Sequence, residues 1–208
     1  MKFLRINFFL SAACLIFCSC FSTLKTAKIT PVGTNSHTLG ASAFTSGPSI
    51  EMAGSLYYCF RRGITEKLEI GFDADLASLS LGIGAKYKLV KSVAVDMNLQ
   101  MSYFLTSFYW RTKHNVPNGN ISLIFGENKL YGGFKYCAIA DASQLTNKEG
   151  VIYPFIGYAI PAGLKLKIIP ELALSFFEVN YDNHNDQIFK FNPLSSTFGI
   201  FFALGVAF

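Results

Sequence analysis

After its first 20 residues the sequence lacks any run of apolar residues long enough to cross a membrane as a helix. A spanning helix needs roughly 20 consecutive apolar residues, whereas the apolar residues here stand in short stretches broken by Gly, Asn, Asp and Lys. Yet 51% of the 208 residues are hydrophobic and 15% are aromatic, which is high for a soluble β protein. The composition therefore leaves two classes for a single domain: a soluble β fold or a membrane β-barrel.

The sequence also lacks a strong charge of one sign and a recognisable catalytic or metal motif. Its formal net charge is +5, and without the basic residues of its N-terminal leader, Lys2 and Arg5, it has 16 basic against 13 acidic residues, or +3. The basic residues are scattered singly, whereas a nucleic-acid surface needs them grouped in a stripe. No metal-ligand spacing and no phosphate-binding glycine loop is present, so we expect no cofactor and no nucleic-acid partner.

The first 20 residues have the layout of a secretory signal peptide. Lys2 and Arg5 precede the apolar run 8–17, and small residues follow near Ser19. An uncleaved helical anchor is the alternative. Residues 15–20, Leu-Ile-Phe-Cys-Ser-Cys, resemble a bacterial lipobox, although Phe17 and Cys18 depart from its usual pattern. The resemblance implies lipidation at Cys20, with ordinary signal-peptidase cleavage nearby as the other route.

Few cysteines remain beyond this leader. Cys59 and Cys137 are the two in the body of the chain, and an exported protein could oxidise such a pair. The strand assignment below places them near opposite ends of their strands, beyond disulfide reach. We therefore predict two free thiols.

From residue 37 onward the dominant hydrophobic period is two, typical of strands with one apolar and one polar face. Residues 21–36 are rich in Thr, Lys and Ser without a period, and we interpret them as a periplasmic tether. The barrel domain is then 37–208. The alternating stretches reach the 9 to 11 residues that a tilted transmembrane strand needs. We expect ten strands, at 37–45, 50–61, 68–76, 79–89, 93–103, 120–126, 129–140, 151–160, 164–176 and 197–208.

The connections between these strands alternate in length. Tight turns follow the second, fourth, sixth and eighth strands, and longer polar loops follow the fifth, seventh and ninth. Outer-membrane barrels show this asymmetry, with short periplasmic turns and longer outside loops. The predicted fold class is therefore all-β, a closed antiparallel transmembrane β-barrel of about ten strands, or eight if the first and sixth fail. The soluble alternative, a lipocalin-like barrel, would turn its large apolar residues inward.

The last strand carries the most specific pattern. Six alternating apolar residues share one face and the chain stops on an aromatic: Phe198, Ile200, Phe202, Leu204, Val206 and Phe208. This pattern resembles the C-terminal assembly signal of bacterial outer-membrane β-barrel proteins, without identifying a family among them. The resemblance implies insertion into the outer membrane of a Gram-negative-type bacterium, with the barrel-assembly machinery and periplasmic chaperones as partners. A turn at residues 61–71 resembles turns common in such barrels.

Charged residues concentrate on the inward faces. The turns place Glu69 opposite Lys86 and Lys86 opposite Asp96, which predicts a row of alternating charges across three strands. Four more lysines point inward near the periplasmic end: Lys67, Lys88, Lys165 and Lys167. Two interpretations stay open, paired charges that fill a narrow lumen and a site for an anionic ligand.

These features favour an outer-membrane barrel with a filled lumen and a structural or surface-interaction role. Its outer loops, at 106–119, 141–150 and 182–196, are where an external ligand, not identified by the sequence, would bind. A narrow channel or small-ligand carrier is the alternative. Histidines and aspartates of the outer loops could in principle activate a water, but they come without a nucleophile motif, and we expect no enzyme. The loop residues concerned are His114, His184, Asp182 and Asp186.

Overall fold

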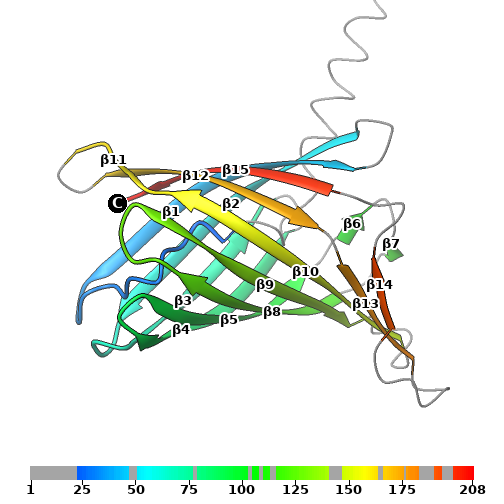
Figure 1. The fold of residues 1–208 in the computed structure, drawn as a ribbon, viewed down its shortest axis with the longest axis horizontal. Helices are drawn as coiled ribbons and strands as arrows, with labels where there is room; N and C mark the ends of the chain where they lie inside the picture. Colours follow the sequence, from blue (N-terminus) through cyan, green and yellow to red (C-terminus); the bar gives the residue numbers. More distant parts are fainter. Residues whose placement is uncertain are drawn as a thin grey trace, which may run out of the picture.

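The computed structural model describes residues 23–46, 51–76, 79–102, 105–107, 110–112, 116–140, 147–163, 166–175, 177–182, 190–193 and 199–208. Ten long strands form one antiparallel sheet that closes on itself (Figure 1). They are β1 (Asn35–Ser46), β2 (Glu51–Gly63), β3 (Leu68–Asp75), β4 (Ser80–Val90), β5 (Val93–Ser102), β8 (Val116–Phe125), β9 (Leu130–Ala140), β10 (Asn147–Tyr158), β12 (Lys167–Ser175) and β15 (Gly199–Ala207).

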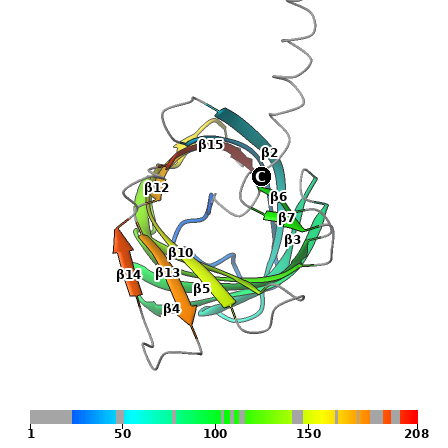
Figure 2. The same ribbon diagram turned by 90° about the vertical axis from the view of Figure 1, so that its right-hand side faces the viewer.

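The sheet closes through β12, which pairs with β15 on one side and with β10 on the other. Neighbouring strands otherwise follow chain order, and β15 pairs with β1. The prediction of a closed ten-stranded antiparallel barrel is confirmed, and the end-on view in Figure 2 shows the ring. Closure leaves neither the first nor the last strand with an unpaired edge, which removes the aggregation hazard of an apolar edge strand.

Short strands extend the barrel at both ends. The strand β11 (Ile160–Pro161) pairs with β12. At the opposite end, β13 (Phe177–Asp182) pairs with β10 and with β14 (Lys190–Pro193), and β6 (Leu105–Ser107) pairs with β7 (Trp110–Thr112). The sixth long strand, β8, begins four residues before the expected Asn120, because β5 offers pairing partners as far as Ser102.

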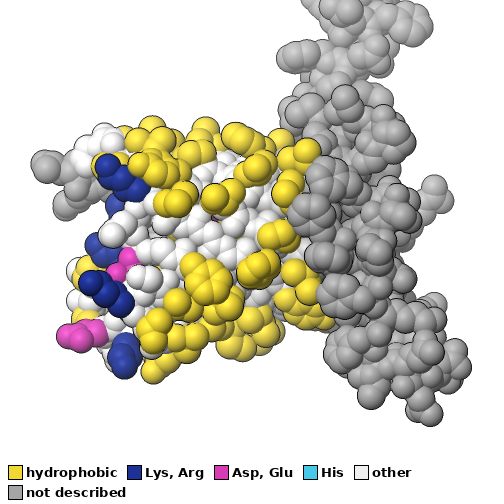
Figure 3. Space-filling view, in the orientation of Figure 1, with side chains coloured by type: hydrophobic (Ala, Val, Ile, Leu, Met, Phe, Trp, Pro, Cys, Tyr) yellow, Lys and Arg dark blue, Asp and Glu magenta, His cyan; other side chains and the backbone are white. Residues whose placement is uncertain are grey.

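The outside of the barrel is apolar, and Figure 3 shows this surface on the face turned toward the viewer. Leu81, Ile83 and Leu99 are each about 70% exposed, at 69%, 70% and 69%. Ile83 and Leu99 are direct cross-strand partners, so the exposed side chains form a continuous surface. The inward positions of the same strands are polar, with Asp73, Lys86 and others buried. This is the reverse of a soluble barrel, so the lipocalin-like alternative is wrong and the fold is a transmembrane barrel.

The C-terminal strand follows the same alternation. Phe202 and Leu204 are exposed on the outer face, whereas Phe201 and Ala203 are buried inside. The backbone of Phe208 exchanges two hydrogen bonds with that of His37, at 3.0 and 2.9 Å, and the two rings stack at 5.4 Å. The final residue is thus fixed to the start of β1. Among the described residues, no helix is both long and apolar enough to span a bilayer.

The segment before β1 differs from the expected tether. Residues 23–30 lie inside the barrel, where Figure 2 shows a blue trace within the ring, and residues 31–34 lead out to β1. Leu24 and Ala27 are fully or almost fully buried, at 1% and 0% exposure. Polar groups of the barrel wall bind the backbone of this segment, which is why a stretch without periodicity becomes ordered. We call residues 23–34 the lumen segment.

Candidate functional site

The deep end of the lumen segment is held by one carboxylate of the wall. The backbone N–H groups of Thr23 and Leu24 donate to the two oxygens of Glu171, at 2.6 and 2.8 Å. Tyr131 donates to the same carboxylate from the neighbouring wall, at 2.8 Å. Glu171 stands on β12 and is 2% exposed. Three donors therefore satisfy a buried charge, and that charge fixes the start of the segment.

The middle of the segment is held by an ion pair of the wall. Glu69 and Lys86 are cross-strand partners, and their charged groups lie 2.8 Å apart. The Lys86 ammonium also donates to the carbonyls of Thr26 and Lys28, at 3.1 and 2.8 Å. Glu69 accepts the N–H of Thr30 at 2.6 Å. The pair thus satisfies backbone donors and acceptors that would otherwise be buried without partners.

Lys25 is the only side chain of the segment's described residues with an ion pair to the wall. Its ammonium lies 2.9 Å from Asp96 and 3.6 Å from Asp73. Asp73 also accepts from Arg61 and from the Tyr57 hydroxyl, both at 2.7 Å, and from the amide of Asn98. The Arg61 guanidinium approaches Asp96 only to 3.8 Å. Lys25 therefore supplies the close cation for Asp96, and the wall itself supplies one for Asp73.

Glycines of the wall make room for the large side chains inside. Gly40 and Gly205 are paired across β1 and β15, and the side chain of Leu24 packs over both. A Cβ at Gly205 would stand 2.9 Å from the Leu24 side chain, so a larger residue there would force that side chain to move. The ring of Tyr131 lies over its partner Gly157 in the same way. The wall therefore complements the lumen segment in shape as well as in charge.

The segment leaves the lumen beside the turn between β2 and β3. Gly33 donates to the carbonyl of Gly63 at 2.9 Å, and Gly63 donates to that of Thr34 at 3.2 Å. Gly33 has a φ of +76°, a conformation that favours glycine, and it turns the chain from the lumen into β1. Ala27 also donates to the carbonyl of Gly126, in the turn between β8 and β9, at 2.9 Å.

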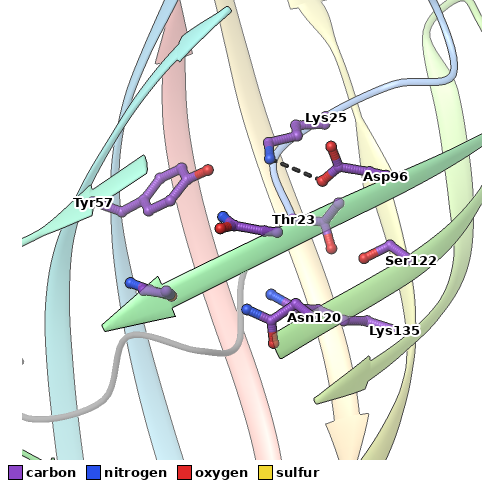
Figure 4. Close-up of a pocket in the computed structure, with 9 residues that line it drawn as sticks. Thr23, Lys25, Tyr57, Asp96, Asn120, Ser122 and Lys135 are labelled. Atoms are coloured by element: carbon purple, nitrogen blue, oxygen red, sulfur yellow. Dashed lines mark hydrogen bonds and ion pairs between the residues drawn. The ribbon is translucent and has the colours of Figure 1, made fainter. Parts of the chain in front are cut away.

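A small polar pocket lies against the segment, and Figure 4 shows the side chains that line it. Its free volume is about 20 Å³, which holds about one water molecule. Four buried oxygens around it have no hydrogen-bond partner within the protein: Thr23 Oγ1, Asp96 Oδ1, Asn98 Oδ1 and Asn120 Oδ1. The pocket therefore presents more acceptors than its present donors satisfy.

The expected row of charges has the expected register. Glu69 pairs with Lys86, and Lys86 with Asp96. The contacts are different, because Lys86 turns to Glu69 and to the lumen segment, whereas Asp96 binds Lys25. Residues 21–36 were interpreted as a tether, so the sequence interpretation missed this partner.

The four additional lysines do not form a basic lining where they are described. Lys67 and Lys167 are exposed near the rim, and Lys88 forms an ion pair with Glu127. Lys165 lies outside the described residues, as does Cys20 with its predicted lipidation. Cys59 and Cys137 are buried free thiols, as predicted.

The sequence interpretation also missed Glu171, Tyr131 and Lys135, all buried in the lumen. One signal was present. Glu171 has an inward-facing position on β12, between the buried Ile169 and Ala173. A buried charge at such a position needs a partner, and the adjoining strands do not supply one. An unpaired inward acid in a predicted barrel thus indicates an additional element in the lumen.

Within the described part of the chain, no group of three or more His, Cys, Asp or Glu residues could hold a metal ion. Of the loop residues considered for catalysis, Asp182 ends β13. His114, His184 and Asp186 lie outside the described residues.

Comparison with known proteins adds little to this description. No family model and no curated protein matches the sequence. Among solved structures, the chain is similar to the crystal structure of the outer membrane protein OprG from Pseudomonas aeruginosa, with 10% sequence identity and a TM-score of 0.33. The match covers 88% of this chain and 99% of that one. The fold assignment rests on the strand pairing and the apolar exterior described above.

Proposed function

We propose that this chain is a bacterial outer-membrane β-barrel protein whose lumen is closed by its own N-terminal segment, with a structural or surface-interaction role carried by its outer loops. The observation that carries the proposal is the position of residues 23–30 inside the barrel, bonded to opposite sides of the wall through Glu171 and through Glu69 and Lys86. We expect a lumen filled in this way to leave no open path for solutes.

Two features support the outer membrane as the location. The exterior is apolar where a bilayer would surround it, and only helices and closed barrels satisfy all backbone groups in lipid. The last strand places Phe202, Leu204 and Phe208 on the outer surface, consistent with the assembly signal that the sequence resembles. Periplasmic chaperones would deliver the chain, and the barrel-assembly machinery would recognise this signal.

The orientation follows from the connections. The turns at 64–67, 91–92 and 126–129 lie at the same end as the start of β1 and the C-terminus (Figure 1). The strand ends that the two longest connections join, from β5 to β8 and from β12 to β15, lie at the other end. In bacterial barrels the short turns face the periplasm. The lumen segment then enters from the periplasmic side, and the long loops face outward, where an external partner would meet them.

Conductance in planar bilayers tests the proposal. The full chain, refolded in detergent and shown to migrate in a heat-modifiable way on a gel, is expected to give no steady current. A steady ion-dependent current from the unaltered protein would refute the closed lumen. Membrane fractionation of the producing cell tests the location separately, since a barrel recovered in the soluble fraction would refute that part.

A second candidate is a narrow channel or small-ligand carrier from which the segment withdraws. One observation favours it: residues 23–30 belong to none of the strands, and every interaction described for them with the wall is a side-chain contact, a hydrogen bond or an ion pair. The segment can leave without breaking any strand pairing. Spontaneous openings of the unaltered protein under voltage would favour this candidate.

A further inference from the structure

The lumen wall carries an excess of acid that the lumen segment partly neutralises. Among the described residues, the buried charged groups of the wall are five carboxylates and three basic groups, with a formal net charge of −2. They are Glu69, Asp73, Asp75, Asp96 and Glu171 against Arg61, Lys86 and Lys135. Lys25 adds a buried cation from the segment. A vacated lumen would therefore attract cations and disfavour anions.

Of the two carboxylates around Lys25, Asp73 is held in place by groups of the wall. Asp73 is fixed on β3 by Arg61 and Tyr57, both at 2.7 Å, and by Asn98. Asp96 stands two strands away on β5, facing the same point. A site whose groups are already oriented loses little free energy in ordering when a ligand binds. The contacts that orient Asp73 do not involve Lys25, so we expect this half of the site to keep its geometry when the side chain of Lys25 is removed.

The acceptors near Lys25 outnumber its donors. One oxygen of Asp96 and the side-chain oxygens of Asn98 and Asn120 are buried without a hydrogen-bond partner and line the same pocket. Carboxylate and amide oxygens together suit a group with several N–H donors and a positive charge. Figure 4 shows the Lys25 ammonium directed at Asp96 among these side chains.

We propose that the Asp73 and Asp96 carboxylates form a binding site for a primary ammonium group, filled in this structure by Lys25 of the lumen segment and open to an unbranched alkylammonium when that side chain is absent. The inference deepens the proposed function, because it names the ligand class of the same lumen. Size sets the class: the pocket adds only about 20 Å³ to the space of one lysine side chain. A quaternary ammonium has no N–H to donate and is wider, so the site rejects it.

Chemical rescue of Lys25→Ala in the full chain tests the site. The Ala variant keeps the segment but vacates the ammonium position. Its midpoint of heat-induced gel-mobility change is measured in n-butylammonium chloride and in tetramethylammonium chloride at equal ionic strength. Butylammonium at about 100 times its Kd should raise the midpoint of Lys25→Ala by about 5 to 10 °C, and tetramethylammonium should leave it unchanged.

Lys28→Ala is the matched control, because it removes the same charge from the same segment at an exposed position. In the control and in the unaltered protein, the midpoint should be the same in n-butylammonium chloride as in tetramethylammonium chloride. If Lys25→Ala folds poorly, refolding yield replaces the midpoint as readout, and butylammonium should raise that yield selectively. Adding Asp96→Asn to Lys25→Ala should abolish the rescue, whereas adding Glu66→Gln, in an exposed turn, should preserve it.

The proposal is overturned if Lys25→Ala and Lys28→Ala respond alike, if tetramethylammonium acts as well as butylammonium, or if the rescue survives Asp96→Asn. These outcomes are independent of the closed lumen, which fails only if the unaltered protein carries a steady current. Rescue in a conducting protein would retain the ammonium site and reject the closed state.

Discussion

Reversing the charge of Lys25 should open the barrel without unfolding it. In Lys25→Glu, a carboxylate would face Asp96 and Asp73, which now lie 2.9 and 3.6 Å from the ammonium. Removing one partner of a buried ion pair costs about 3 to 5 kcal/mol, and like charges add repulsion. Residue 25 belongs to none of the strands, so its replacement removes no strand pairing. The cost therefore falls on the seating of the lumen segment and not on the wall.

The size of the effect follows from this cost. Each 1.4 kcal/mol changes an equilibrium tenfold, so 3 to 5 kcal/mol shifts the ratio of closed to open barrels by roughly 100- to 4,000-fold. The other contacts of the lumen segment, to Glu171 and to Lys86, remain in the variant. These contacts limit the fraction of barrels in which the segment has left the lumen. We expect a segment that is out of the lumen for a measurable fraction of time.

Single-channel recording at pH 8, well above the ordinary pKa of a glutamate, measures this fraction. Lys25→Glu should show steady or flickering current with preference for cations, seen as a reversal potential in a KCl gradient. Lys28→Glu makes the same charge change at an exposed position of the segment and should stay closed. A Lys25→Glu protein that migrates as a folded barrel and stays as silent as Lys28→Glu would refute the reasoning.

Three further predictions concern the lumen. Glu171→Ala leaves two buried backbone donors without an acceptor and should lower the free energy of unfolding by about 2 to 6 kcal/mol in urea, whereas Glu171→Gln keeps an acceptor and should cost less. Gly205→Ala places a Cβ 2.9 Å from the leucine of the lumen segment and should cost about 1 to 3 kcal/mol. Gly119→Ala, whose Cβ would meet its nearest side chain at an ordinary 3.6 Å, should be nearly neutral in the same assay. Cys59 and Cys137 should resist maleimide in the folded barrel and react after denaturation, as read by mass spectrometry of their peptides, and rapid labelling of the folded protein would contradict their burial.

The wall of the barrel was predictable because each strand carries its own evidence. A period of two over about ten residues fixes which side chains face outward, and the turn between two such stretches fixes their register. The pairing of Glu69 with Lys86, and of Lys86 with Asp96, followed from this logic alone. The outward positions of Leu81, Ile83 and Leu99 followed in the same way.

The lumen segment was not predictable by the same route, because its order comes from partners far along the chain. Thr23 and Leu24 bind a carboxylate 148 and 147 residues away, and Lys25 binds one 71 residues away. Nothing in the local pattern of residues 21–36 marks such contacts. The available signal was on the wall, where inward acids such as Glu171 had no assigned partner.

The excess of acid in the wall gives a physical reason for a lumen segment of this kind. A narrow barrel cannot leave carboxylates buried and unpaired, because an isolated buried charge is costly. The wall meets part of this need with Arg61, Lys86 and neutral donors such as Tyr57 and Tyr131. A second set of contacts comes from backbone N–H groups and Lys25 of the lumen segment. Because that second set comes from a segment outside the strands, the same contacts that stabilise the closed lumen can be lost without opening the sheet. Stability of the wall and closure of the lumen are therefore separable quantities, and the contrast between charge reversal at Lys25 and at Lys28 measures the second while leaving the first unchanged.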